Sequence, residues 1–184
     1  DSAGGNLTIG VELLCKAEGV IVPAHQILIY PSVDLPMSFP SVNEFARGYF
    51  LTKAGMTWFR SHYLEAPEQA SDPSLLFLER DLSGLSPTFI VTAGFDPLRD
   101  EGKALADRLQ DCGVEVAHVC YTDMIHGIDP VSRFKKALNH ILQNHNDADL
   151  FVITGDITDL GDKESYQLFI KFCLYFHYQK EMAF

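Results

Sequence analysis

The chain opens with Asp1-Ser2-Ala3-Gly4-Gly5, which has the form D-S-x-G and matches most of a nucleophile elbow. A nucleophile elbow is a G-x-S-x-G turn that exposes a serine between a strand and a helix. Its backbone is sharply bent, so small residues must flank the serine, because a larger side chain would collide with the next strand. We expect the first glycine of the pattern to precede Asp1 and the chain to be a fragment. Taken alone, the motif is also compatible with an ordinary loop.

Length and composition indicate an acidic globular chain. Its 184 residues suit one ordinary domain, or one domain and a piece of another. A formal net charge of −11 argues against a nucleic-acid partner or an anionic membrane surface, since both require a basic face. No apolar run reaches membrane length, so we expect no membrane span, and no pattern predicts an oligomeric state. The cysteines lack a C-x-x-C spacing and indicate free thiols in a reducing cytoplasm; they are Cys15, Cys112, Cys120 and Cys173.

The segment after the elbow predicts a helix over residues 6–16 that Gly19 ends. Because an elbow serine sits where this helix begins, the helix N-terminus would favour negative charge that develops near Ser2. One face of the helix is expected to pack on the domain, and it carries Leu7, Val11, Leu14 and Cys15.

Three apolar runs predict the strands of a mostly parallel sheet, and the chain is therefore of the α/β class. Residues 26–30 and 87–93 are nearly continuous apolar runs, as in strands buried on both faces. Residues 114–121 alternate in polarity, which is typical of a strand at a sheet edge. Helices are expected over residues 53–63, capped by Thr52, and over residues 99–112, ended by Gly113.

Residues 32–73 differ in composition from the rest of the chain, since they are rich in proline and in aromatic side chains. Two interpretations stay open for this excursion between two strands. In the first interpretation, it covers a pocket that binds the acyl or alcohol part of a substrate. Alternatively, its rings simply pack the helix over residues 53–63 onto the domain.

Three candidate catalytic residues appear in the order Ser2, Asp96, His126, and each is expected at a strand-to-loop transition. The carboxyl ends of the strands form the edge where α/β sheets assemble their sites. A serine hydroxyl needs a neutral imidazole to take its proton, and a carboxylate holds that imidazole in the correct tautomer. The order Ser…Asp…His is that of the α/β-hydrolase fold. Asp100 is the nearest alternative to Asp96, but its position favours the role of a first-turn acid beside the helix dipole.

Longer motifs resemble the hormone-sensitive-lipase-like esterases of the α/β-hydrolase superfamily. The resemblance covers about residues 1–127, which corresponds to the C-terminal part of that fold, from the elbow onward. The motifs that carry it are DSAGGNL at 1–7, IYP at 29–31, GYFL at 48–51, LSGLSP at 82–87, TAGFDPLRDEG at 92–102 and MIHG at 124–127.

This resemblance implies a serine carboxylic-ester hydrolase that acts on a small-molecule ester through an acyl-enzyme and needs no cofactor. It makes Ser2 the nucleophile, His126 the base and Asp96 the triad acid, with the N–H of Ala3 as one oxyanion donor. The H-G-G-G loop of the family, which supplies further oxyanion donors, lies upstream of the elbow and is absent from this sequence. Because one lost donor costs roughly 10²–10³ in rate, we expect this chain by itself to be inactive. A non-catalytic fragment is the alternative from a different class.

Residues 128–184 predict a short appended α/β segment to which this resemblance does not extend. Asp129 and Pro130 are expected to open a helix. The apolar strand and acidic loop at residues 149–162 resemble the G-D-x-x-D-x-G element of calcineurin-like metallophosphoesterases. That resemblance makes Asp156 a candidate ligand of two metal ions in a metal-dependent phosphodiesterase fragment. Since the partner ligands of such a site are missing, we hypothesise that two unrelated coding segments join near residue 127.

Overall fold

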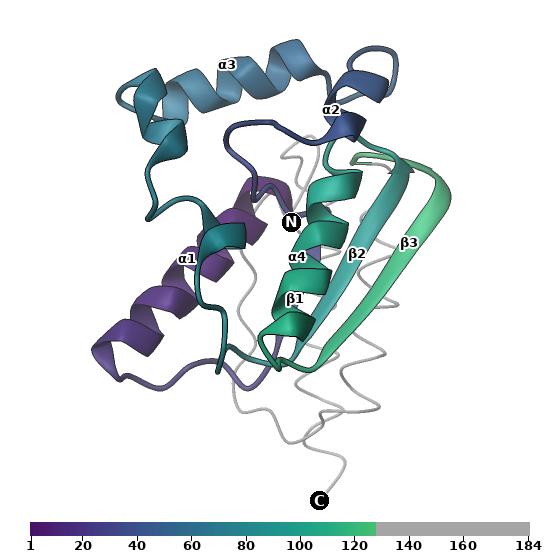
Figure 1. The fold of residues 1–184 in the computed structure, drawn as a ribbon. Helices are drawn as coiled ribbons and strands as arrows, with labels where there is room; N and C mark the ends of the chain where they lie inside the picture. Colours follow the sequence, from purple (N-terminus) through teal and green to yellow (C-terminus); the bar gives the residue numbers. More distant parts are fainter. Residues whose placement is uncertain (128–184) are drawn as a thin grey trace, which may run out of the picture. The chain divides into compact units, whose positions relative to one another are not determined.

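The computed structural model of the protein describes residues 1–127, which are drawn in colour in Figure 1. They belong to one compact unit of the chain, Asp1–Ile128. The helix expected after Asp129, the strand expected within residues 149–162 and the candidate ligand Asp156 lie outside the described residues. These three remain predictions. No helix within residues 1–127 is long and apolar enough to cross a membrane.

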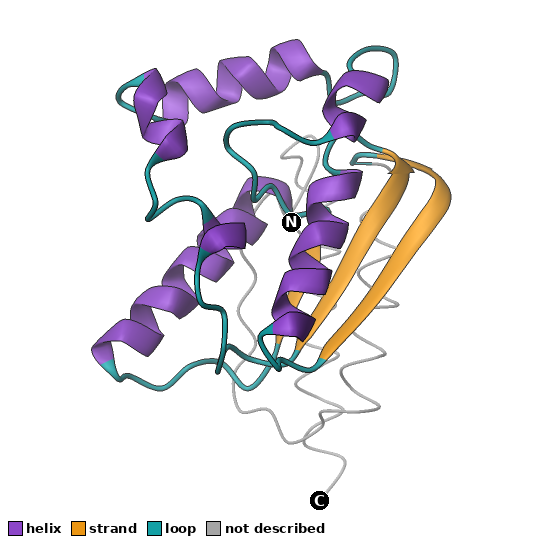
Figure 2. Ribbon diagram, viewed as in Figure 1, coloured by secondary structure: helices purple, strands orange, loops and turns teal. Residues whose placement is uncertain are grey.

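The described residues contain a three-stranded parallel sheet (Figure 2). Its strands are β1 (Gln26–Ile29), β2 (Thr88–Phe95) and β3 (Val116–Ile125), paired in the order β1-β2-β3. The predicted strands are thus confirmed in type and position, and both pairings are parallel. The last strand is longer than predicted, since it ends at Ile125 rather than at residue 121.

The extension of β3 depends on a glycine in β2. The register between the two strands is regular up to Ala93 and resumes at Phe95, with an irregularity between them. A Cβ atom on Gly94 would collide with the backbone of Thr122. Only glycine leaves room for the two backbones to approach here, so β3 continues past the irregularity toward the candidate site.

Helices cover the sheet and share one hydrophobic core with it. Helix α1 packs against β1, and helix α4 packs against β2 and β3 (Figure 1). The buried apolar cluster includes Ile9 and Leu13 from the first helix and Leu105 and Leu109 from the last. The helices are α1 (Ser2–Glu18), α2 (Pro40–Glu44), α3 (Lys53–Tyr63) and α4 (Arg99–Asp111), with short 3-10 turns at Pro67–Ser71 and Phe77–Glu79.

Helix α1 faces the core with a side that differs from the predicted one. The prediction placed Leu7, Val11 and Leu14 inside, but each of them leaves half or more of its surface exposed. Ile9 and Leu13 are buried instead. Two apolar stripes with helical spacing are present in this segment, and periodicity cannot tell which of them meets the sheet.

Gly5 decides which stripe is inside. A Cβ atom at this position would lie 2.6 Å from the Cβ atom of Pro31, which follows β1. The helix can approach the strand this closely only where a side chain is missing, and this contact sets the rotation of α1 about its axis. The helix also begins at Ser2 rather than at residue 6, while Gly19 ends it in the left-handed conformation, as predicted.

Helix α3 has the predicted bounds and the predicted cap. The Thr52 hydroxyl accepts a hydrogen bond from the Gly55 N–H at 3.0 Å, which satisfies one of the orphan donors of the first turn. None of its residues is buried, and Trp58 and Phe59 expose more than half of their surface. Those two rings therefore do not pack the helix onto the described part of the domain, contrary to the second interpretation of this excursion.

Candidate active site

Ser2 occupies a strained backbone at the start of α1. Its φ of 42° lies in the left-handed region, which costs a non-glycine residue about 1–3 kcal/mol. This is the conformation that the sharp turn of a nucleophile elbow imposes on its serine. The carbonyl of Ser2 accepts a hydrogen bond from the N–H of Ser32 at 3.1 Å. Because Ser32 follows β1, this bond places the elbow at the carboxyl edge of the sheet.

Asp96 and His126 form a buried hydrogen-bonded pair at the same edge. The Nδ1 atom of His126 lies 2.8 Å from the Oδ2 atom of Asp96. Asp96 is 0% exposed and His126 is 6% exposed. The other carboxylate oxygen, Oδ1, accepts the N–H of Leu98 at 2.8 Å. Where the carboxylate accepts this hydrogen bond, Nδ1 of the ring is the donor, and Nε2 is the ring nitrogen that does not face Asp96.

The structure therefore brings two of the three candidates into direct contact. Asp96 follows β2 and His126 follows β3, and these strands are neighbours, so their ends meet. Within residues 1–127, no hydrogen bond joins the hydroxyl of Ser2 to His126. Ala3 is the second residue of α1, where backbone N–H groups lack an acceptor within the helix. Such an N–H is suited to stabilise developing negative charge.

Tyr30 is a part of the site that the sequence analysis missed. It directly follows β1, is buried, and has a φ of 37°, again in the left-handed region. Its ring centroid lies 4.4 Å from that of His126, with the planes tilted by 52°. Tyr30 belongs to the IYP motif at 29–31, which was used for the family resemblance without a role for the tyrosine.

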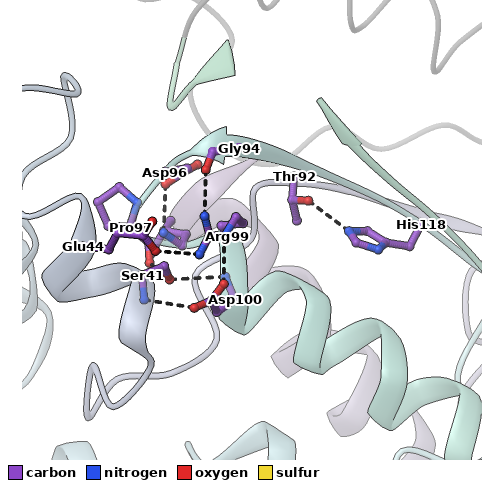
Figure 3. A network of polar contacts seen from close by, with 10 residues as sticks. Ser41, Glu44, Thr92, Gly94, Asp96, Pro97, Arg99, Asp100 and His118 are labelled. Atoms are coloured by element: carbon purple, nitrogen blue, oxygen red, sulfur yellow. Dashed lines mark hydrogen bonds and ion pairs between the residues drawn. The ribbon is translucent and has the colours of Figure 1, made fainter. Parts of the chain in front are cut away.

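An ionic network fixes the loop between Asp96 and helix α4 (Figure 3). The Arg99 guanidinium donates to Asp100 and to Glu44, each at 2.8 Å, and to the carbonyl of Gly94 at 3.1 Å. It also lies 4.8 Å from the centroid of the Phe45 ring. The start of α4 is thereby tied both to α2 and to the end of β2, which Asp96 directly follows.

Asp100 also belongs to this network, and both of its carboxylate oxygens accept hydrogen bonds within it. Its Oδ2 accepts the N–H of Ser41 at 3.0 Å, and the Ser41 hydroxyl donates to the carbonyl of Pro97 at 2.7 Å. Partial burial would raise the pKa of Asp100, but hydrogen bonds from Arg99 and Ser41 outweigh it and lower the pKa. These contacts give Asp100 a structural role at the start of α4.

Candidate metal ligands do not gather in the described part of the chain. Among residues 1–127, no group of three or more histidine, cysteine, aspartate or glutamate side chains could hold a metal ion. The candidate ligand Asp156 lies outside these residues. The metal-site hypothesis for the second segment is therefore still a prediction.

This fold and this arrangement of residues define an α/β-hydrolase. Residues 1–129 match the model of a family described as having the alpha/beta hydrolase fold, and the chain belongs to that family. The resemblance to its hormone-sensitive-lipase-like members is thereby confirmed. The family match ends at residue 129 and lends no support to the metallophosphoesterase resemblance of residues 149–162.

Particular relatives are esterases from bacteria, archaea and environmental samples. A carboxylic ester hydrolase of Mycobacterium tuberculosis, LipN, is 40% identical over 133 residues, which are 69% of this chain and 35% of the relative. An ester hydrolase from the metagenome of Lake Arreo, solved with a bipyridine phosphonate derivative, is 45% identical, with a TM-score of 0.65 over 69% of this chain and 41% of that one. A hyperthermophilic esterase of Pyrobaculum calidifontis is 33% identical, with a TM-score of 0.69 over 78% and 49% of the two chains.

The chain spans less than half the length of the curated relatives that it matches. The covered share is 35% for LipN, 37% for an arylesterase of Saccharolobus solfataricus and 41% for the carboxylesterase NlhH of Mycobacterium tuberculosis. The family match over residues 1–129 contains all three candidate catalytic positions.

Proposed function

We propose that this chain carries the catalytic triad of a serine carboxylic-ester hydrolase. Ser2 is the nucleophile, His126 is the base and then the acid, and Asp96 orients the imidazole. The observation that carries the proposal is the buried hydrogen bond between His126 and Asp96, 2.8 Å long, at the sheet edge where the strained elbow of Ser2 also lies.

The reaction follows from these roles in two balanced steps. The Ser2 hydroxyl attacks the ester carbonyl while Nε2 of His126 takes its proton, and the resulting oxyanion accepts a hydrogen bond from the N–H of Ala3. When the tetrahedral intermediate collapses, the alcohol leaves with the proton from His126, and the acyl group stays on Ser2. Water then repeats the sequence, with His126 as base, and releases the acid.

Burial of the pair contributes to this chemistry. The Asp96 carboxylate is shielded from water, so its attraction to the imidazolium that forms during attack is stronger than it would be at the surface. Its second oxygen is held by Leu98, which leaves a single orientation for the oxygen that faces His126. The relatives are described as carboxylic ester hydrolases, an ethyl acetate hydrolase and an arylesterase, which supports small carboxylic esters as the substrate class.

A fluorophosphonate probe tests this proposal without a guess at the substrate. Such a probe phosphonylates only a serine that a working base activates, and peptide mass mapping then locates the adduct. The missing oxyanion donors slow ester turnover but leave the base beside the serine, so we still expect an adduct on Ser2 of the 184-residue chain and none on Ser2→Ala. The matched control is Ser61→Ala, which changes an exposed serine of α3 and should label as the parent chain does.

Two further measurements distinguish an inactive site from an unfolded chain. Near-ultraviolet circular dichroism and gel filtration establish that each variant is folded and monodisperse. A folded parent chain without an adduct on Ser2 contradicts the proposal for this chain and favours the non-catalytic alternative. Labelling in the presence of EDTA should be unchanged, whereas labelling that EDTA abolishes would count against a metal-free serine mechanism.

A further inference from the structure

Glu101 is a buried carboxylic acid that hydrogen-bonds to the backbone after β1, close to the candidate site. It lies in the first turn of α4 and is 0% exposed. Its Oε1 atom accepts the N–H of Val33 at 2.7 Å and the N–H of Asp34 at 3.3 Å. Among the described residues, its Oε2 atom has no hydrogen-bond partner. Burial of a carboxyl group with one unpaired oxygen costs free energy, so we ask what Glu101 contributes at this position.

The surroundings of Glu101 favour its neutral form. Burial raises its pKa well above the ordinary value, the hydrogen bonds from Val33 and Asp34 oppose this, and the negative charges of Asp34 and Asp96 raise it further. A neutral acid in this position adds no second negative charge beside Asp96. It still offers a carbonyl oxygen to the two backbone N–H groups.

The backbone that Glu101 holds also contacts both ends of the candidate site. We call residues 30–34, which follow β1, the clamp segment. Its first residue packs its ring on His126, and its third donates its N–H to the carbonyl of Ser2 at 3.1 Å. Its last two residues donate to Glu101. The contacts of the clamp segment are therefore Tyr30 with His126, Ser32 with Ser2, and Val33 and Asp34 with Glu101.

Backbone strain is concentrated where the clamp segment meets the elbow. Tyr30 and Ser2 both have positive φ, 37° and 42°, at a cost of about 1–3 kcal/mol each. Such conformations persist only where the surroundings impose them. Glu101 supplies two of the hydrogen bonds that do so, and the close packing of Gly5 on Pro31 supplies a steric constraint.

We propose that Glu101 is a positioning residue for the reaction: its buried carboxyl group holds the clamp segment so that Tyr30 and Ser32 set the placement of His126 and Ser2. The inference rests on the function proposed above. The hydrogen bonds of Glu101 go to Val33 and Asp34 and not to Ser2 or His126, so it acts through the backbone of the clamp segment. Glutamine can replace it, because a neutral amide oxygen accepts the same two N–H groups, whereas leucine cannot.

The test compares Glu101→Gln with Glu101→Leu in the 184-residue chain. The first readout is the rate of fluorophosphonate labelling of Ser2, together with kcat and KM for p-nitrophenyl acetate. Since a misplacement of about 1 Å costs on the order of 10²-fold in rate, we expect E101L to lose about 10- to 100-fold in labelling rate and in kcat, with little change in KM. E101Q should stay within about threefold of the parent, because it keeps the acceptor and the shape.

Glu12 provides the matched control. It is likewise a buried carboxyl group that holds a backbone N–H, that of Ser86, at 2.6 Å, and its Oε2 atom also lacks a partner among the described residues. Ser86 precedes β2, so Glu12 acts at the opposite end of the strands from the site. Glu12→Leu should lower the stability without lowering kcat. An equal loss of kcat in E12L and E101L would overturn the proposal.

A second readout does not depend on catalysis. The NMR signals of the His126 ring report on its environment in a parent chain that is folded but not labelled. We expect these signals to shift in E101L and to keep their positions in E101Q and E12L. A parent chain that is not labelled counts against the proposed function, while unchanged His126 signals in E101L count against the role of Glu101.

One more variant covers a failure of E101L to fold. Glu101→Asn keeps a polar group but draws it back by one methylene, out of reach of Val33 and Asp34. It should show the same loss of labelling rate and the same change in the His126 signals. If E101N behaves like E101Q in both readouts, the carboxyl group does not hold the clamp segment and the inference is wrong.

Discussion

The Nδ1 atom of His126 lies 2.8 Å from the Oδ2 atom of Asp96, although 30 residues of chain separate them. The two residues follow neighbouring parallel strands, so the sheet brings them together at one edge. The other oxygen of Asp96 is taken by Leu98. The geometry of the carboxylate is thereby settled before any substrate binds, and this makes the pair the most sensitive place to test.

Replacing Asp96 with asparagine should nearly abolish activation of Ser2. The amide keeps the hydrogen bond to Leu98, but its N–H₂ group favours the wrong tautomer of His126. For such a change, the loss is roughly 10⁴-fold in a serine hydrolase triad. Fluorophosphonate labelling of D96N measures it. Asp107→Asn on the exposed side of α4 is the control and should label as the parent chain does, since it removes only a surface ion pair with Lys103.

Replacing Gly5 with alanine should destabilise the fold. The new Cβ atom would lie 2.6 Å from the Cβ atom of Pro31, and the ring of a proline cannot move aside cheaply. Overpacking of this kind costs about 1–3 kcal/mol in the free energy of unfolding, measured by urea denaturation. Gly10→Ala in the same helix is the control, since its Cβ atom would lie 3.5 Å from Phe77, an ordinary contact. G10A should gain roughly 0.5–1 kcal/mol.

Raising the pH should destabilise the parent chain relative to Glu101→Gln. The pKa of Glu101 is raised in the folded state by burial, so the folded protein binds its proton more tightly than the unfolded chain does. The stabilising contribution is complete below the unfolded-state pKa and is lost as the pH rises through the folded-state pKa. Between the two values, the difference in unfolding free energy should change by about 1.4 kcal/mol per pH unit in favour of E101Q.

Urea denaturation at several pH values above 4.5, the ordinary pKa of a glutamate side chain, measures this difference. Glu12→Gln offers a comparison, because burial also raises the pKa of Glu12, though the shift is less pronounced than that of Glu101. Its effect should have the same sign and cover a narrower pH range. Stability curves of E101Q and the parent chain that run parallel over the whole range would contradict a raised pKa for Glu101.

Removing the cap of α3 should loosen that helix selectively. Thr52→Ala deletes the hydroxyl that accepts the N–H of Gly55, at a cost of about 1 kcal/mol. Because α3 buries none of its residues, the loss should appear as faster amide hydrogen exchange within Lys53–Tyr63. Thr57→Ala is the control, since its hydroxyl only donates to the carbonyl of Lys53 on the exposed surface. Equal exchange in both variants would show that the cap contributes nothing.

Local patterns predicted the elements well where one physical cause dominates. The cap at Thr52 and the bounds of α3 follow from a side chain that bonds its own helix, and the stop at Gly19 follows from its left-handed backbone. The strands are short apolar runs between turn residues, and a parallel sheet buries such runs on both faces. Asp96 and His126 were found because residues at strand ends share one sheet edge.

Local sequence patterns could not predict the contacts between segments that lie far apart in the chain. The face of α1 that is buried depends on the close contact between Gly5 and Pro31. The length of β3 depends on the close approach of its backbone at Thr122 to Gly94. Tyr30 and Glu101 lie in motifs at 29–31 and 92–102 that resemble the family, but the pattern does not indicate their roles, because an aromatic residue at a strand end and an acid in a first helical turn are common in any α/β fold.

The sequence by itself determined the order of strands and helices, the turn that holds Ser2, and the chemical types at the ends of β2 and β3. These are consequences of side-chain periodicity and of backbone preferences that act within a few residues. Only the tertiary structure decided which face of α1 is buried, that His126 and Asp96 are in hydrogen-bond contact, and that Glu101 lies behind them. The reason is that these relationships arise when the sheet aligns segments far apart in the chain, and close packing then admits one arrangement.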